Sequence, residues 1–174
     1  MPTMQPSPRD LAIAARDSGH LYPDGHYAVI SHAGLTSAPQ RVAEVFGVQP
    51  GAAVIRRDRV HRDVMGVPLS WSTSWFIGTL AGVCPKLLKR ERIVEGTANY
   101  IAACRGTDIV RGRDVVTAVA ANHEQARLLD VEMATAVQVV TTCWFAADDV
   151  AVEFGESLSV GRSVSYDYLV TSTQ

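Results

Sequence analysis

The chain has few cysteines, no long apolar run and no excess of basic residues. Its three cysteines, Cys84, Cys104 and Cys143, are far apart in a sequence of 174 residues. Their odd number and wide spacing fit neither a disulfide framework nor a metal site, so we expect buried free thiols in a reducing cytoplasm. No stretch approaches the roughly 18 uncharged apolar residues of a membrane span, and residues 1–8 lack a signal-peptide pattern. We therefore expect a cytoplasmic protein without a membrane anchor.

The charge balance argues against direct binding of nucleic acid. The formal net charge is −2 and the isoelectric point is about 6.2, so nothing indicates that this chain alone grips a phosphate backbone. Hydrophobic residues make up 47% of the sequence and charged residues 20%, which is typical of a folded protein. At this length we expect one domain with a sizeable core.

The motifs of common enzyme classes are also missing. No Walker loop or dinucleotide-binding fingerprint occurs, and the histidines show no metal-ligand spacing. Residues 61–63 (His-Arg-Asp) match the start of a kinase catalytic loop without its downstream asparagine, and residues 155–159 (Gly-Glu-Ser-Leu-Ser) resemble a nucleophile elbow without its final glycine. No nucleophile stands with a base and an orienting group. We expect no catalytic residues, no metal and no cofactor, and hence no enzyme.

What the sequence does contain is a repeat. Residues 43–74 and 126–157 follow the same order of elements, 83 residues apart and without a gap. Each unit contains the end of a short helix, a tight turn, a strand, a hairpin and a return strand. Neither unit can bury an apolar face alone, so we expect the two to pair into one sheet.

Turn, cap and alternation signals predict an α+β domain: an antiparallel sheet of about six strands, with helices mainly on one face and an internal pseudo-repeat. Strands are expected at residues 28–32, 53–61, 68–75, 109–121, 137–146, 151–160 and 164–170. Helices are expected to start at capping residues: Ser37 to Gly47 with Gln40 reaching back, Thr97 to Cys104 before Gly106, Asn122 to Leu129, and a short one ending at Arg16. Residues 78–89 are expected to form a loop with short helical pieces.

Polar residues alternate with apolar ones along the predicted strands. The polar sides carry serines, basic residues and one glutamate: Ser70, Ser72 and Ser74; Arg57, Arg59 and His61; Arg111 and Arg113; Glu153 and Ser157. Two interpretations stay open. The polar sides form the solvated face of an antiparallel sheet, or they line a cleft between the two units that holds a small polar ligand.

A succession of short segments carries a family resemblance: residues 42–51 (Val-Ala-Glu-Val-Phe-Gly-Val-Gln-Pro-Gly), 54–60, 66–68, 72–76 (Ser-Thr-Ser-Trp-Phe), 96–97, 110–114 and 152–157. In this order they resemble the UTRA effector-sensing domain of GntR-type bacterial transcription regulators, HutC subfamily. The resemblance implies a chorismate-lyase-like fold, a cytoplasmic homodimer and a small-molecule effector held in the domain. Effector binding would reorient an N-terminal winged-helix pair and so change operator affinity.

The resemblance also implies effector-binding positions. The arginine of the first strand corresponds best to Arg59, and the late glutamate is retained as Glu153. The whole expected set is Arg57, Arg59, His61, Ser72, Ser74, Thr97, Asn99, Arg111, Glu153 and Ser157. Ser72 replaces an acidic residue and Asn99 a tyrosine, so a sugar-phosphate effector is not favoured. We expect a polar effector, with an anionic one among the options.

Domain boundaries follow from the same comparison. Residues 1–27 are expected to be a flexible lead-in or linker, and residues 28–170 the ligand-sensing domain. The segment 1–35 is too short for a winged helix and has no basic recognition helix, so operator contact is expected only through a DNA-binding domain outside this chain.

Two alternatives to a sensor stay open. One is a lyase-type enzyme on the same fold, in which Arg59, Arg111 and Glu153 would retain an aromatic carboxylic acid. Fold kinship alone is a weak argument for such an activity. The other alternative is a dimerisation module that binds no ligand.

Overall fold

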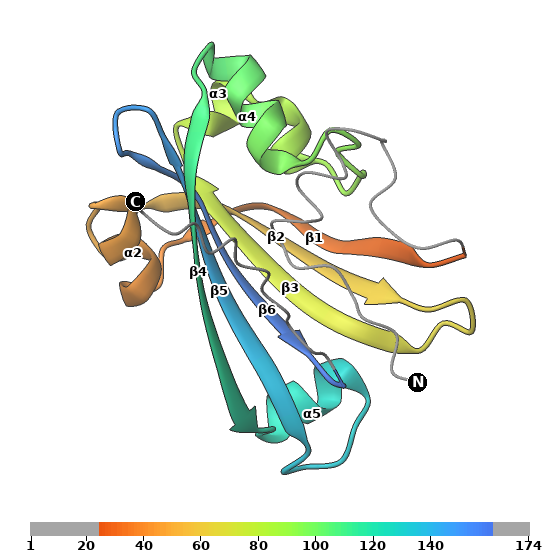
Figure 1. Ribbon diagram of the computed structural model, residues 1–174. Helices are drawn as coiled ribbons and strands as arrows, with labels where there is room; N and C mark the ends of the chain where they lie inside the picture. Colours follow the sequence, from red (N-terminus) through yellow and green to blue (C-terminus); the bar gives the residue numbers. More distant parts are fainter. Residues whose placement is uncertain (1–24, 162–174) are drawn as a thin grey trace, which may run out of the picture.

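The computed structural model describes residues 25–161 (Figure 1). The elements are β1 (Tyr27–Ser37), α2 (Gln40–Phe46), β2 (Ala53–Arg62), β3 (Pro68–Ile77), α3 (Leu80–Val83), the 3-10 helix η1 (Pro85–Leu88), α4 (Thr97–Arg105), β4 (Ile109–Ala120), α5 (His123–Leu129), β5 (Ala136–Ala146) and β6 (Ala151–Ser159). Within the described range no helix has the length and hydrophobicity needed to cross a bilayer.

All six strands form one antiparallel sheet in the order β1-β2-β3-β6-β5-β4. Two three-stranded units, β1-β2-β3 and β4-β5-β6, therefore meet at β3 and β6. In this central pair Thr73 lies opposite Glu156, and the two residues are themselves 83 positions apart in the sequence. A pseudo-twofold axis passes through this pair and relates the two units. The predicted α+β fold class with an internal pseudo-repeat is confirmed.

The repeat extends to the backbone of the turns after α2 and α5. Gly47 and Asp130 end the two helices with φ of 64° and 54°, and Gly51 and Ala134 follow with φ of 84° and 62°. The hydrogen bonds that close the turns are Ala38 N to Ala52 O and Ala121 N to Thr135 O, both at 2.8 Å. Each pair of positions is separated by 83 residues. The spacing thus reflects a repeated backbone path, although few side chains are shared.

The two helix starts differ. The side chain of Asn122 accepts a hydrogen bond from Gln125 N, and that of Gln125 accepts one from Asn122 N, which is the predicted capping box of α5. The prediction that Ser37 caps α2 is wrong. Pro39 occupies the N-cap position without a side-chain cap hydrogen bond, because Ser37 is the last residue of β1.

Strand β1 is longer than the 28–32 predicted. Its pairing with β2 continues through Gly34 to Ser37, with one bulge between Ile30 and His32. Gly34 is accommodated within β1, opposite Arg56, because the sheet environment outweighs local propensity. The helix predicted up to Arg16 and the strand predicted at 164–170 lie outside the described residues.

The prediction that the helices lie mainly on one face of the sheet is wrong, because they are divided between its two faces. Alternation along β3 sends Trp71 and Trp75 to one face, and Ser72, Ser74 and Phe76 to the other. Helix α2 packs at Trp75 and α5 at Trp71, so these two helices share the tryptophan face. Helix α3, η1 and α4 pack around Phe76 on the serine face, at one end of the sheet (Figure 1). The rest of the serine face is left for the site described next.

Candidate ligand site

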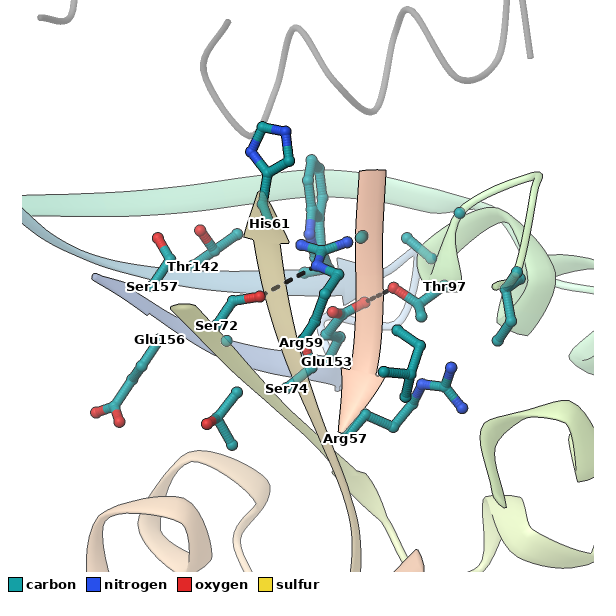
Figure 2. Close-up of a pocket in the computed structure, with 18 of the residues that line it drawn as sticks. Arg57, Arg59, His61, Ser72, Ser74, Thr97, Thr142, Glu153, Glu156 and Ser157 are labelled. Atoms are coloured by element: carbon teal, nitrogen blue, oxygen red, sulfur yellow. Dashed lines mark hydrogen bonds between the residues drawn. The ribbon is translucent and has the colours of Figure 1, made fainter. Parts of the chain in front are cut away.

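A cavity of about 270 Å³ lies on the serine face of the sheet (Figure 2). Residues of all six strands line it, and one wall is formed by residues 92–99, which follow η1 and include the first turn of α4. All predicted site residues except Arg111 line it: Arg57, Arg59, His61, Ser72, Ser74, Thr97, Asn99, Glu153 and Ser157. The polar sides of the central strands therefore face a cavity rather than an open sheet surface.

The cavity lies across the pseudo-twofold axis, because positions 83 residues apart line it in pairs. These pairs are Arg57 and Val140, Arg59 and Thr142, His61 and Trp144, Ser70 and Glu153, Ser72 and Gly155, Thr73 and Glu156, and Ser74 and Ser157. The first unit supplies basic residues where the second supplies an aliphatic residue, a hydroxyl and an indole. The part of the cavity lined by Arg59 and His61 is thus more basic than the part lined by Val140, Thr142 and Trp144.

Arg59 presents its guanidinium to the cavity. Its Nε donates to Ser72 Oγ at 3.2 Å, and among residues 25–161 its Nη atoms have no hydrogen-bond partner. Figure 2 shows the guanidinium near the centre of the site, above Glu153. Unoccupied Nη groups can hold a carboxylate or phosphate through two parallel hydrogen bonds. His61 is the next inward residue on the same strand and lies in ring contact with His26, at 5.4 Å between centroids.

Glu153 is a buried carboxyl on β6, only 7% exposed. The hydroxyl of Thr97 donates to its Oε2 at 2.6 Å. Burial raises the pKa of Glu153 above its usual range, whereas hydrogen bonds from Thr97 and Ser74 and the charges of Arg59 and Arg57 act to lower that pKa. A buried carboxyl in such surroundings is suited to recognise hydrogen-bond donors on a ligand.

Arg57 lines the cavity but directs its guanidinium elsewhere. The Nη1 atom donates to the carbonyl oxygens of Lys86, Leu87 and Lys89 at 2.7–3.0 Å, and Nη2 donates to Glu91 O at 2.8 Å. In Figure 2 this guanidinium points away from the other labelled side chains. Arg57 is 5% exposed, and burial lowers its pKa. The two neighbouring arginines of β2 therefore have different surroundings.

The N-terminus of α4 points toward the cavity. Thr97, Ala98 and Asn99 line the cavity, and Tyr100 N makes the first intrahelical bond, to Gly96 O at 3.0 Å. The N–H groups of a first helical turn have no intrahelical acceptor and favour a nearby negative charge. The prediction that Thr97 caps this helix is wrong. Gly96, at φ 81°, occupies the cap position, which leaves the Thr97 hydroxyl for Glu153.

The apolar side of the cavity is built around Trp144 on β5. Its ring lies over Gly112 of β4, where an added Cβ would be 2.6 Å from the indole, so the glycine makes room for it. Neither Trp144 nor Thr142 is among the site residues predicted from the sequence. Their positions, 83 residues after His61 and Arg59, were the signal that could have identified them.

Two charged residues near the cavity are turned away from it. Arg111 forms an ion pair with Asp149, and its guanidinium lies 3.6 Å from the centroid of the Phe145 ring. The alternation of β4 explains this position, because Gly112 and not Arg111 is paired with Trp144. Glu156 directs its carboxylate away from the other labelled side chains (Figure 2). It forms an ion pair with Arg41 of α2, on the tryptophan face.

The donor set suits binding of a small polar molecule. It includes the guanidinium of Arg59, the buried carboxyl of Glu153, several hydroxyls, an imidazole and an indole. Between residues 25 and 161 no group of three or more His, Cys, Asp or Glu side chains could hold a metal ion. Cys84, Cys104 and Cys143 are free thiols, and none of them lines this cavity.

Comparisons with known proteins identify relatives of this chain. The UTRA domain profile matches residues 28–165, whereas no curated protein sequence matches the chain. The ligand-binding domain of a protein assigned to the GntR family of transcriptional regulators, from Bordetella bronchiseptica, has 22% identity and a TM-score of 0.68, with 86% of this chain and 95% of that chain covered.

Two further solved structures share the fold. The C-terminal domain of the histidine utilization repressor from Pseudomonas syringae pv. tomato has 16% identity and a TM-score of 0.67, with 84% and 99% of the two chains covered. PhnF from Mycobacterium smegmatis has 21% identity and a TM-score of 0.66. That alignment covers 86% of this chain and only 65% of PhnF.

Proposed function

Because the chain belongs to the UTRA domain family, we propose that it is the effector-sensing and dimerising domain of a GntR-type transcription regulator of the HutC subfamily. The proposal includes a cytoplasmic homodimer whose operator affinity depends on a winged-helix domain outside this chain. It is supported by the UTRA match and by the likeness in fold to GntR-family ligand-binding and C-terminal domains.

The observation that carries the proposal is the cavity on the pseudo-twofold axis. Arg59 and the start of α4 supply positive charge and N–H donors, while Glu153 supplies a buried acceptor. We propose a small polar effector with an anionic group near Arg59 and a hydrogen-bond donor toward Glu153. The volume of about 270 Å³ is slightly below the usual range for drug-sized ligands, which favours a small metabolite.

Ligand binding would alter the relation between the two units. A molecule in this cavity contacts both units and the residues that precede α4, so its affinity depends on how these parts are arranged. A ligand that binds one arrangement more tightly shifts the population toward it. In a dimer, such a shift would change the spacing of the attached DNA-binding domains and therefore the operator affinity.

A thermal-shift screen with small carboxylates, phosphates and amino compounds tests the proposal. A true effector should stabilise the protein saturably, by about 2.7 kcal/mol at about 100 times its Kd. Arg59→Met should weaken binding about tenfold or more, since it removes a charge-assisted contact. The matched control is Arg111→Met, which removes the same charge outside the cavity and should leave binding unchanged.

Two results would contradict the sensor proposal. One is a screen in which no compound class stabilises the protein, as a ligand-free dimerisation module would behave. The other is an equal loss of binding in Arg59→Met and Arg111→Met, because then the cavity would not be the binding site. Sedimentation velocity of the purified chain tests the homodimer separately.

A further inference from the structure

Residues 85–99, here called the cap, include the cavity wall at 92–99 and are not part of the sheet. The cap comprises η1, an irregular stretch and the first turn of α4. Its buried apolar residues in the core are Leu87 and Ile93, and Leu88 packs against them partly buried. Much of the cavity lining belongs to the second half of the cap. The position of this short segment therefore determines the shape of the site.

Two buried charged side chains of the sheet hold the cap, one near each end. Arg57 of β2 donates four hydrogen bonds to main-chain carbonyls between Lys86 and Glu91, at 2.7–3.0 Å. Glu153 of β6 accepts one hydrogen bond from the Thr97 hydroxyl, at 2.6 Å. Both side chains are buried. The first contact uses only backbone acceptors, whereas the second involves two groups that line the cavity.

The geometry of Arg57 differs from that of a ligand contact. A planar guanidinium directs several donors in fixed directions, and here its Nη donors are directed at carbonyl oxygens of one short segment, η1 and the residues after it. An anion in the cavity could reach these donors only by displacing the carbonyls. Buried carbonyl groups that lose their donors carry a desolvation cost. Arg59, two residues away on the same face, has its Nη atoms directed at the cavity instead.

We propose that Arg57 is a positioning residue that fixes the backbone of residues 86–91, and through it the cavity wall at 92–99. Effector contact belongs to Arg59 and to the Glu153–Thr97 pair. The start of the cap is thus held by hydrogen bonds from Arg57 that take no part in ligand binding. The end of the cap is held by the Thr97–Glu153 hydrogen bond, which a ligand in the cavity can reach. The part that concerns effector contact rests on the proposed sensor function, whereas the holding of the cap by Arg57 does not.

Hydrogen–deuterium exchange of the chain without ligand tests the role of Arg57. Arg57→Met should accelerate exchange of peptides covering residues 85–99 about tenfold, while peptides from α5 and β5 keep their protection. The matched control is Arg59→Met, which removes the same charge from the same strand and face. It should leave exchange in residues 85–99 within about twofold of the wild type.

Arg57→Lys separates positioning from a general effect of charge. A single ammonium keeps the charge but cannot reproduce the fork of donors, so exchange in the cap should lie between those of wild type and Arg57→Met. If circular dichroism shows that Arg57→Met does not fold, the exchange measurement on Arg57→Lys tests the proposal instead. Local acceleration in residues 85–99 supports the proposal.

Two results would overturn the positioning role of Arg57. One is exchange of residues 85–99 at the wild-type rate in either Arg57 variant. The other is an equal acceleration of that exchange in Arg57→Met and Arg59→Met. These measurements use no effector. A failed screen for ligands would therefore leave their outcome intact, and the two proposals can fail independently.

Discussion

The two units of the sheet share a backbone and differ in chemistry. At positions 83 residues apart they repeat the strand order, the turn hydrogen bonds and the left-handed residues after the helices. Where they meet at the cavity, Arg59 and His61 of the first unit lie at the positions that Thr142 and Trp144 occupy in the second. The backbone is constrained by sheet pairing, whereas side chains facing a cavity are free to diverge. A symmetric scaffold thereby holds an asymmetric site.

The tryptophan face shows a second difference between the units. Trp71 and Phe154 occupy equivalent positions, but Phe154 packs with α2 in a stacked pair with Trp75, at 5.6 Å between centroids. Trp71 packs beside α5 and is only partly buried. Burial of equivalent aromatic residues thus depends on which helix covers them.

The largest effect on stability is expected when the aromatic side chains at these two equivalent positions are truncated to alanine. Phe154→Ala should lower the free energy of unfolding by about 3–5 kcal/mol, because it opens a cavity and removes a stacked partner. The equivalent change Trp71→Ala should cost about 2 kcal/mol, since less of its surface is removed from the core. Urea denaturation measures both values. Equal losses would show that the two helices cover the sheet equally well.

Substitutions in the two repeated turns are expected to have smaller effects on the free energy of unfolding, with opposite signs in the two units. Gly51→Ala should lower the free energy of unfolding by about 1 kcal/mol, because a Cβ is disfavoured at its φ of 84° although space is free around it. Ala134→Gly should raise it by up to about 1 kcal/mol by relieving that conformation at φ 62°. Thermal unfolding monitored by circular dichroism compares the two variants. The same sign in both would mean that the turns are not equivalent.

The last comparison concerns pH, since Glu153 lies at the position equivalent to Ser70. Burial raises the pKa of Glu153 in the folded protein above its unfolded value of about 4.5. Between these two values the folded state binds the extra proton, so the free energy of unfolding falls as pH rises through this window. Above the window the full cost of the buried charge is present, and below it the cost is absent.

Glu153→Gln should therefore flatten the decrease in stability across this pH window and gain stability relative to the wild type above it. Denaturation at a series of pH values gives the slope. Ser70→Ala is the matched control in the other unit, and its slope should equal that of the wild type. A steeper decrease in Glu153→Gln would contradict a raised pKa.

Part of this site was predictable and part was not. Serines alternating with tryptophans placed Ser72 and Ser74 on one face, and the spacing of Arg57 and Arg59 placed both on the same side. Alternation predicts the face but not the target of a long side chain. Arg57 is directed at carbonyls of the cap, and that cap has no periodic pattern from which its path could be predicted.

By itself, the sequence determined the repeated path of the chain: six strands, the capping box of α5 and the glycine that ends α2, because these depend on local alternation and turn chemistry. Only the tertiary structure decided what lies across the central β3–β6 pair. Pairing through Thr73 and Glu156 brings residues 83 positions apart around one cavity. Tertiary contacts also place the Thr97 hydroxyl against Glu153 and pair Arg111 with Asp149. These outcomes depend on contacts between segments far apart in the chain, which local patterns do not encode.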